Sequence, residues 1–223
     1  MDRILPHNDG LTMTNPDLLF NGPAKAPLTF AFAHGAGAGM DSDFMEYFAH
    51  ALAKGGLRVA RFEFPYMAQR REDARKRPPD RAPVLIDTWR SVIAEIGRER
   101  CIVAGKSMGG RIASLVAAEM EVARAPVRGA VYLGYPFHAP GKPMGSRDLP
   151  LDAAKTPTLI LQGERDPFGP RGELETFKFG RGVTVHYLAD GDHSLVPRKS
   201  SGHTKEQNWS EAVAAIGAFA ERL

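Results

Sequence analysis

Short apolar runs alternate with amphipathic stretches along most of this 223-residue chain, and this alternation limits the folds that it can adopt. Six runs have the length and residue types of buried strands, and they lie at residues 28–33, 57–64, 101–106, 128–134, 158–162 and 183–188. Apolar residues with helical spacing follow near 42–54, near 84–97, from 108 onward, near 171–179 and near 208–221. Strands alternating with helices predict an α/β fold, in which a mostly parallel sheet of about six or more strands carries helices on both faces. Asp41 or Ser42 is expected to cap the first helix.

The most specific motif is Gly105-Lys106-Ser107-Met108-Gly109, which follows the apolar run at 101–104. So tight a turn strains the backbone at Ser107, and the two glycines relieve the crowding around it. Beyond the turn, apolar residues share one helix face, namely Met108, Ile112, Leu115 and Val116. Strand, turn and helix are the context of the G-x-S-x-G nucleophile elbow, which lifts the serine hydroxyl above the sheet edge and indicates an enzyme. The competing interpretation is a tight connection that carries an inert serine.

One histidine has the position that a catalytic base would need. A serine hydroxyl is a poor nucleophile until a base removes its proton, and in this architecture the histidine follows a later strand. His193 lies in the loop after strand 183–188. The other six histidines are His7, His34, His50, His138, His186 and His203. Because His34 and His138 also follow strands, we expect them to line the site.

A carboxylate must hold the tautomer of the base, and it should precede the histidine in the chain. Asp166 lies in the loop after strand 158–162. Glu164 competes with it, and Asp190 and Asp192 are more distant rivals. The Asp-Pro step favours Asp166, because proline fixes the turn that would hold the carboxylate.

The tetrahedral intermediate of acyl transfer needs two N–H donors. The elbow supplies that of Met108, and the second is expected from the loop after strand 28–33. After His34, this loop at 34–39 contains only glycine and alanine, so its backbone can approach a ligand closely. We assign the second donor to Ala36, with the glycines on either side of it as alternatives.

The composition argues against several classes of protein. The net charge is only +3 and the apolar runs are short, so neither a nucleic-acid partner nor a membrane span is expected. The N-terminus lacks the apolar stretch of a signal peptide, and the single cysteine, Cys101, cannot form an internal disulfide. We therefore expect a cytoplasmic protein, monomeric or homodimeric. One domain over residues 1–223 is expected, with residues 1–20 as a loosely packed segment.

We expect no metal ion and no cofactor. The glycine-rich loop at 35–39 superficially suggests dinucleotide binding. Gly35 and Gly37 fit the first two glycines of the G-x-G-x-x-G pattern, but Met40 takes the position where the pattern requires glycine or alanine.

A basic segment follows strand 57–64. Residues 70–81 hold six basic and three acidic residues, a net charge of +3 that equals that of the whole chain. Such a run is usually a solvated surface. The alternative is that it attracts an anionic substrate or partner, because it starts at the active edge of the sheet.

Five stretches together resemble the α/β-hydrolase superfamily, and they are residues 34–39, 61–67, 105–111, 134–138 and 163–169. The resemblance runs from about residue 20 to the C-terminus and is closest to the compact dienelactone-hydrolase-like branch, which includes testis-expressed-protein-like predicted hydrolases. It implies a triad of Ser107, Asp166 and His193. Dienelactone hydrolases proper have a cysteine where Ser107 stands.

The resemblance also bears on access to the site. Many α/β-hydrolases carry a helical cap at this point of the chain, but residues 135–155 are rich in proline and glycine and lack helical periodicity. We therefore expect an open site without a helical cap domain. His34, Gly35, Tyr66 and His138 are the expected substrate contacts.

These features favour a serine hydrolase that cleaves a carboxylic ester or thioester of a small-molecule acyl substrate through an acyl-enzyme. One alternative is a binding or scaffold protein that keeps the fold without turnover. Another is an acyltransferase, in which an alcohol takes the acyl group instead of water.

Overall fold

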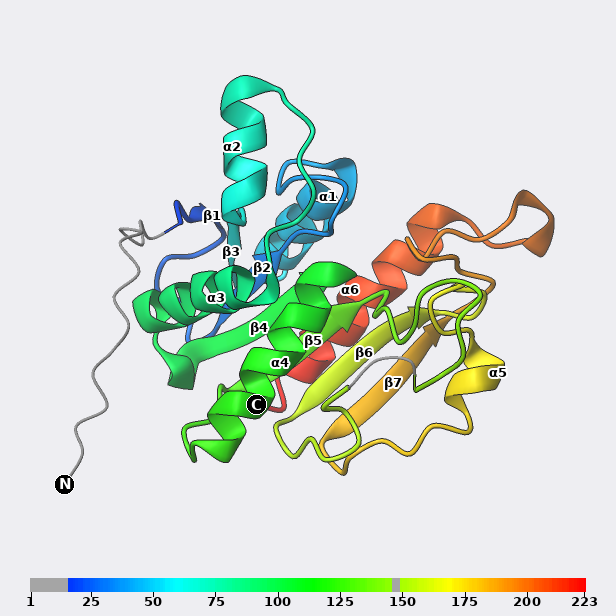
Figure 1. Cartoon of the computed structure of the whole chain (residues 1–223). Coiled ribbons are helices and arrows are strands. Elements are labelled where there is room, and N and C mark those ends of the chain that lie inside the picture. The colour runs from blue at the N-terminus through cyan, green and yellow to red at the C-terminus, as the bar shows by residue number, and fades with distance from the viewer. Residues whose placement is uncertain (1–15, 146–148) are drawn as a thin grey trace.

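Seven strands build one sheet in the computed structural model of the chain, which describes residues 16–145 and 149–223. In sheet order they are β1 (Leu19–Asn21), β3 (Arg58–Phe62), β2 (Thr29–Ala33), β4 (Cys101–Lys106), β5 (Gly129–Leu133), β6 (Thr158–Gly163) and β7 (Val183–Leu188) (Figure 1). β1 runs antiparallel to β3, and every other neighbouring pair is parallel. The carboxyl ends of β2 to β7 therefore meet at one edge of the sheet.

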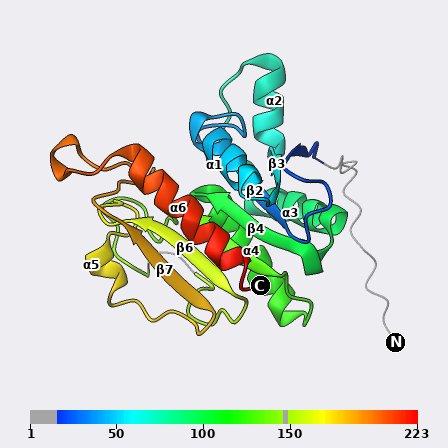
Figure 2. The same ribbon diagram turned by 180° about the vertical axis from the view of Figure 1, so that it is seen from behind.

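Helices cover both faces of this sheet. Those in the described residues are α1 (Asp43–Lys54), α2 (Pro65–Asp73), α3 (Ala82–Ile96), α4 (Met108–Val122), α5 (Arg171–Leu174) and α6 (Lys205–Ala220), with short 3₁₀ turns at Arg98–Arg100 and Lys199–Ser201. α3 and α4 pack together on one face, and α1 and α6 lie side by side on the other (Figures 1 and 2). The expected α/β fold is confirmed.

The central strands are buried on both faces, which explains why their sequences are continuous apolar runs. Successive side chains of a strand point to opposite faces. In β2, Phe30 and Phe32 join the core formed with α1 and α6, whereas Ala31 and Ala33 join the core formed with α3 and α4. Trp89 of α3 anchors the second core and is fully buried.

Three elements differ from the sequence-based expectation. β1 was not predicted, because three residues at a sheet edge carry almost no periodic pattern. α2 was not predicted because its nine residues bury only Tyr66 and Met67 and are otherwise largely polar. The helix expected near 171–179 is the four-residue α5, because the chain then leaves the helix through turns and places Phe177 and Phe179 against Phe137.

The ends of two helices also differ. Ser42 is the N-cap of α1 but its side chain makes no capping hydrogen bond, and the carboxylate of Asp41 binds Arg71 instead. α6 starts three residues earlier than expected, because Thr204 and Gln207 form a capping box there. Between β5 and β6, the described residues 134–145 and 149–157 form turns and no helix, so no helical cap lies there in that part of the chain.

Within the described ranges, no helix has the length and apolar character needed to span a bilayer. Part of the segment expected to be loosely packed, residues 1–15, lies outside the described residues.

Candidate active site

Ser107 lies between β4 and α4, at the carboxyl edge of the sheet. Its backbone has φ 51° and ψ −116°, a strained conformation for a residue with a Cβ, which costs about 1–3 kcal/mol. The N–H of Ser107 donates to the carbonyl of Leu133 over 3.0 Å, which ties the bend to β5. A Cβ at Gly105 would overlap the backbone of Gly109, and one at Gly109 would overlap the carbonyl of His34. Glycine is therefore needed at both positions for α4 to start this close to the sheet.

A continuous chain of hydrogen bonds joins Ser107, His193 and Asp166. The Oγ of Ser107 lies 2.8 Å from Nε2 of His193, and Nδ1 of His193 lies 2.8 Å from Oδ2 of Asp166. An ionised carboxylate only accepts, so Nδ1 carries the proton and Nε2 is free to accept that of the serine. The structure thus brings together the three residues that were expected to form a triad, from the loops after β4, β6 and β7.

Two groups hold the carboxylate of Asp166, which is fully buried. The Nε2 of Gln162 donates to Oδ2 over 3.0 Å, and the N–H of Phe168 donates to Oδ1 over 2.9 Å. Gln162 is itself fixed, because its Oε1 accepts from the N–H of Tyr135 over 2.8 Å. The ring of Phe168 also lies 4.3 Å from that of His193, centroid to centroid. Asp166 therefore faces the base in one orientation.

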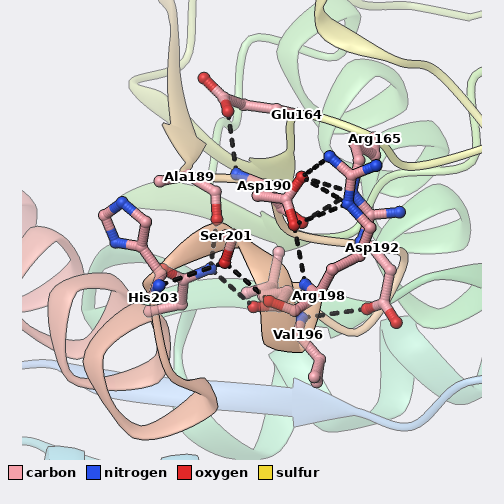
Figure 3. Close-up of polar contacts among 11 residues, drawn as sticks. Glu164, Arg165, Ala189, Asp190, Asp192, Val196, Arg198, Ser201 and His203 are labelled. Carbon is pink, nitrogen blue, oxygen red and sulfur yellow. Dashed lines mark hydrogen bonds and ion pairs between the residues drawn. The ribbon is translucent and has the colours of Figure 1, made fainter.

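The rival carboxylates have other partners. Glu164 accepts from the N–H of Asp190 over 2.9 Å and from Arg171 over 2.9 Å. Hydrogen bonds from Arg198 lower the pKa of Asp190 to about 2. Asp192 accepts from two backbone N–H groups of its own loop. All three carboxylates therefore bind groups of the surrounding loops and not His193, as Figure 3 shows for the contacts around Asp190.

These contacts fix the loop that carries His193. Arg165 donates from its backbone to Gly191 and from its side chain to the carbonyl of Asp190, each over 2.9 Å. α6 holds the same loop from the other side. Asn208 donates to the carbonyl of Leu195 over 3.0 Å, and the indole of Trp209 donates to that of Ser194 over 2.9 Å. His193 is thus held by both the preceding loop and the last helix.

The glycine-rich loop after β2 is supported from beneath by His34 and Tyr66. Nδ1 of His34 donates to the carbonyl of Gly35 over 2.7 Å, and its Nε2 accepts from the N–H of Phe64 over 3.1 Å. Burial lowers the pKa of His34, which agrees with this neutral tautomer. The hydroxyl of Tyr66 donates to the carbonyls of Gly35 and Ala36 over 3.3 and 3.0 Å.

α2 and β3 hold the far end of this loop. Arg71 binds Glu63 with contacts of 2.6 and 3.0 Å and binds Asp41 over 2.8 Å. Glu63 in turn accepts from the N–H of Met40 over 3.3 Å. Arg70 donates to the carbonyl of Gly37 over 3.3 Å. Two residues of the basic segment therefore contact the loop itself or its immediate support.

A cavity of about 310 Å³ opens above the serine. Its walls are the loop and the start of α1, together with the residues beside the hydrogen-bond chain, and the lining is Gly35, Ala36, Gly37, Ala38, Ser42, Phe44, Met45, Lys106, Ser107, His193 and Ser194. The backbone N–H groups of Ala36 and Met108 make no hydrogen bond to other groups of the described chain. In the described ranges, no three His, Cys, Asp or Glu side chains gather as metal ligands would.

The expected substrate contacts divide into two groups. Gly35 lines the cavity, as expected. His34, Tyr66 and His138 do not line it, and at most 3% of each is exposed. His34 and Tyr66 support the loop, while His138 lies 3.0 Å from Glu173, near α5. These polar side chains make hydrogen bonds inside the protein. Their positions after strands do not show whether a polar side chain makes such a bond or contacts a substrate.

Several residues around the site were not predicted. Gln162 and Phe168 hold Asp166, and Asn208 and Trp209 hold the loop of His193. Gln162 could have been found, because a glutamine in the otherwise apolar run of β6 needs a buried partner.

Residues 26–221 match the family described as the alpha/beta hydrolase domain. The chain belongs to the alpha/beta hydrolase family. Among solved structures, it is similar to dienelactone hydrolase from Anabaena variabilis, with 19% identity, a TM-score of 0.67, and 94% of this chain and 99% of that one covered. It is also similar to an alpha-beta serine hydrolase homologue from Coxiella burnetii, with 18% identity, a TM-score of 0.66 and coverage of 93% and 98%. A monoacylglycerol lipase from Paleococcus ferrophilus gives 14% identity, a TM-score of 0.62 and coverage of 92% and 100%.

At these identities, the solved structures show the shared fold, and they agree with the expected resemblance to dienelactone hydrolases. They carry no information about the substrate of this alpha/beta hydrolase.

Proposed function

We propose that this alpha/beta hydrolase is a serine hydrolase that cleaves carboxylic esters or thioesters through an acyl-enzyme. The observation that carries the proposal is the hydrogen-bond chain from Ser107 through His193 to the buried Asp166, with contacts of 2.8 Å at both steps. A connection with an inert serine would need neither a base at the hydroxyl nor a carboxylate behind that base. The strained backbone of Ser107 also fits a functional role, because strain of this kind gathers at active sites.

The first half of the reaction forms the acyl-enzyme. Nε2 of His193 takes the hydroxyl proton while Oγ of Ser107 attacks the carbonyl carbon, and the C=O electrons move onto oxygen. The N–H groups of Ala36 and Met108 are the proposed donors to this oxyanion. When the carbonyl reforms, the alcohol or thiol leaves with the proton that His193 returns.

The second half repeats these steps with water. His193 removes a proton from water, the resulting hydroxide attacks the acyl carbon, and Ser107 leaves with a proton from His193. Asp166 stays ionised and stabilises the imidazolium in both halves. No metal ion or cofactor enters this scheme.

Labelling with a fluorophosphonate tests the nucleophile directly. We expect a single adduct on Ser107, and we expect Ser107→Ala to lose both the label and the hydrolysis of a p-nitrophenyl ester. Ser194→Ala is the matched control, because Ser194 also lines the cavity and is expected to be dispensable for both. A folded wild-type protein that neither takes the label nor hydrolyses esters would favour the non-catalytic scaffold.

A further inference from the structure

Lys106 is charged and lies beside the proposed catalytic groups, yet the mechanism above does not use it. It is the last residue of β4, directly before Ser107, and its side chain lines the cavity. Its Nζ donates to the backbone carbonyl of His193 over 2.5 Å. This contact joins the strand that carries the nucleophile to the loop that carries the base, across 87 positions of sequence.

The end of β5 is shaped around this contact. Gly134 has φ 59°, and a Cβ there would lie 2.9 Å from Nζ of Lys106 and 2.5 Å from the carbonyl oxygen of His193. A side chain at this position would therefore separate the two groups. The glycine at this position is a second observation beside the hydrogen bond, because Gly134 follows β5 and belongs to neither of the two segments that the hydrogen bond joins.

The groups that face the ammonium come from four elements. The carboxylates of Asp166 and Asp192 attract it, from the loops after β6 and β7. The ring of Phe44 in α1 lies 5.5 Å away, and β5 contributes only the backbone of Gly134. His193 is the remaining titratable group at this contact. Burial lowers the pKa of Lys106 to about 8, with the two carboxylates opposing that change.

We propose that Lys106 is a positioning residue, whose ammonium holds the main chain of His193 so that Nε2 meets Ser107. The inference rests on the proposed serine-hydrolase function. Its first effect is geometric, because small displacements of a base are costly in rate. Its second effect is the strength of this contact, because a hydrogen bond from an ammonium is stronger than one from a neutral amine.

Three variants separate these effects from mere structural support. Lys106→Met removes donor and charge, Lys106→Arg keeps both without titrating in the accessible range, and Lys178→Met is the control at an exposed lysine. We expect Lys106→Met to lower kcat by about tenfold to a hundredfold with KM nearly unchanged. Lys106→Arg should retain more activity than Lys106→Met.

The alkaline side gives a separate readout. A neutral amine is a weaker donor than an ammonium, so the wild type should lose part of its kcat/KM as pH rises above about 8, the pKa to which burial lowers Lys106. Lys106→Arg should show no such decline, and Lys178→Met should behave as the wild type. Identical profile shapes in wild type and Lys106→Met, or a loss of kcat that merely follows the fraction of unfolded protein, would overturn the proposal.

A measurement without turnover distinguishes this inference from the proposed function. The main-chain order of the loop at His193 can be measured by NMR relaxation in wild type and Lys106→Met. We expect lower order parameters for His193 in the variant, because the contact that ties its carbonyl to β4 is lost. Unchanged order parameters at His193 contradict the role of Lys106 even in an active enzyme. A protein that shows the loss of order but never labels at Ser107 contradicts the serine-hydrolase function instead.

Discussion

At the scale of the residue, the site combines a strained nucleophile with a fully buried acid. Asp166 has three partners, namely His193, Gln162 and the N–H of Phe168, and its carboxylate is closed to solvent. Glu164, two residues away, faces a different set of partners. This division of roles decides which carboxylate can orient the base.

Exchange of the two acids tests that division. Asp166→Asn should keep the fold and lower kcat by roughly 10⁴-fold, because an amide favours the wrong tautomer of His193. Glu164→Gln should leave kcat within a fewfold range, since Glu164 supports the loop of His193 through the N–H of Asp190 but does not contact His193 itself. Both kcat values are to be measured beside the melting temperature. The opposite ranking of the two variants would make Glu164 the acid.

The strain at Ser107 predicts that glycine at this position gives a more stable protein than alanine does. At φ 51°, a residue with a Cβ destabilises the folded state by roughly 1–2 kcal/mol, and glycine does not, because it has no Cβ. Ser107→Gly should therefore unfold with a higher free energy than Ser107→Ala, although both variants are inactive. Denaturant unfolding measures the difference. A glycine variant no more stable than the alanine variant would show that the bend is not strained.

At the scale of the element, α2 is the part of the fold that changes the interpretation of the sequence. The basic segment was expected to be either a solvated surface or a means of attracting anions. In the structure, Arg70 and Arg71 bind the glycine-rich loop and its support, and Arg77 pairs with Asp73. Within the described residues, Arg75, Lys76 and Arg81 form no ion pair.

Removal of Arg71 should loosen the loop that carries the proposed oxyanion donor. Its side chain is 47% exposed, so we expect a moderate decrease in kcat, about threefold to tenfold, with a smaller change in KM. Arg71→Met tests this by steady-state kinetics. Arg77→Met is the matched control, because Arg77 pairs within its own segment and should leave kcat unchanged. Equal effects of the two variants would reduce α2 to a surface helix.

At the scale of the whole molecule, the positions of six of the seven strands along the chain could be predicted, whereas the support of the site could not. Buried parallel strands can be recognised as apolar runs in the sequence. Once the elbow at Ser107 is recognised, an acid and then a histidine are expected in later loops, which leads to Asp166 and His193. The contacts of Gln162, Lys106 and Asn208 join segments distant in sequence, and no local pattern reports such pairs. The weakly periodic α2 and the short β1 escaped prediction for the related reason that neither has a long apolar face.

The open cavity predicts a preference for short acyl groups. Phe44 and Met45 provide one apolar wall, but the turns between β5 and β6 add no helix above it in the described residues. Each buried CH₂ contributes about 0.8 kcal/mol only while a wall covers it. We expect kcat/KM to fall as the acyl chain grows beyond a few carbons, measured with p-nitrophenyl esters. A steady rise to long chains would reveal an apolar tunnel.

The anchoring of the His193 loop by α6 has a consequence for the newborn protein. Synthesis produces Ser107, the proposed nucleophile, long before His193, the proposed base, and the loop of His193 becomes fixed only when Asn208 and Trp209 have folded against it. A growing chain that has not yet made α6 therefore carries Ser107 without a fixed partner at its hydroxyl. In this arrangement, the proposed activity depends on the folding of α6 as much as on the three residues that would carry it out.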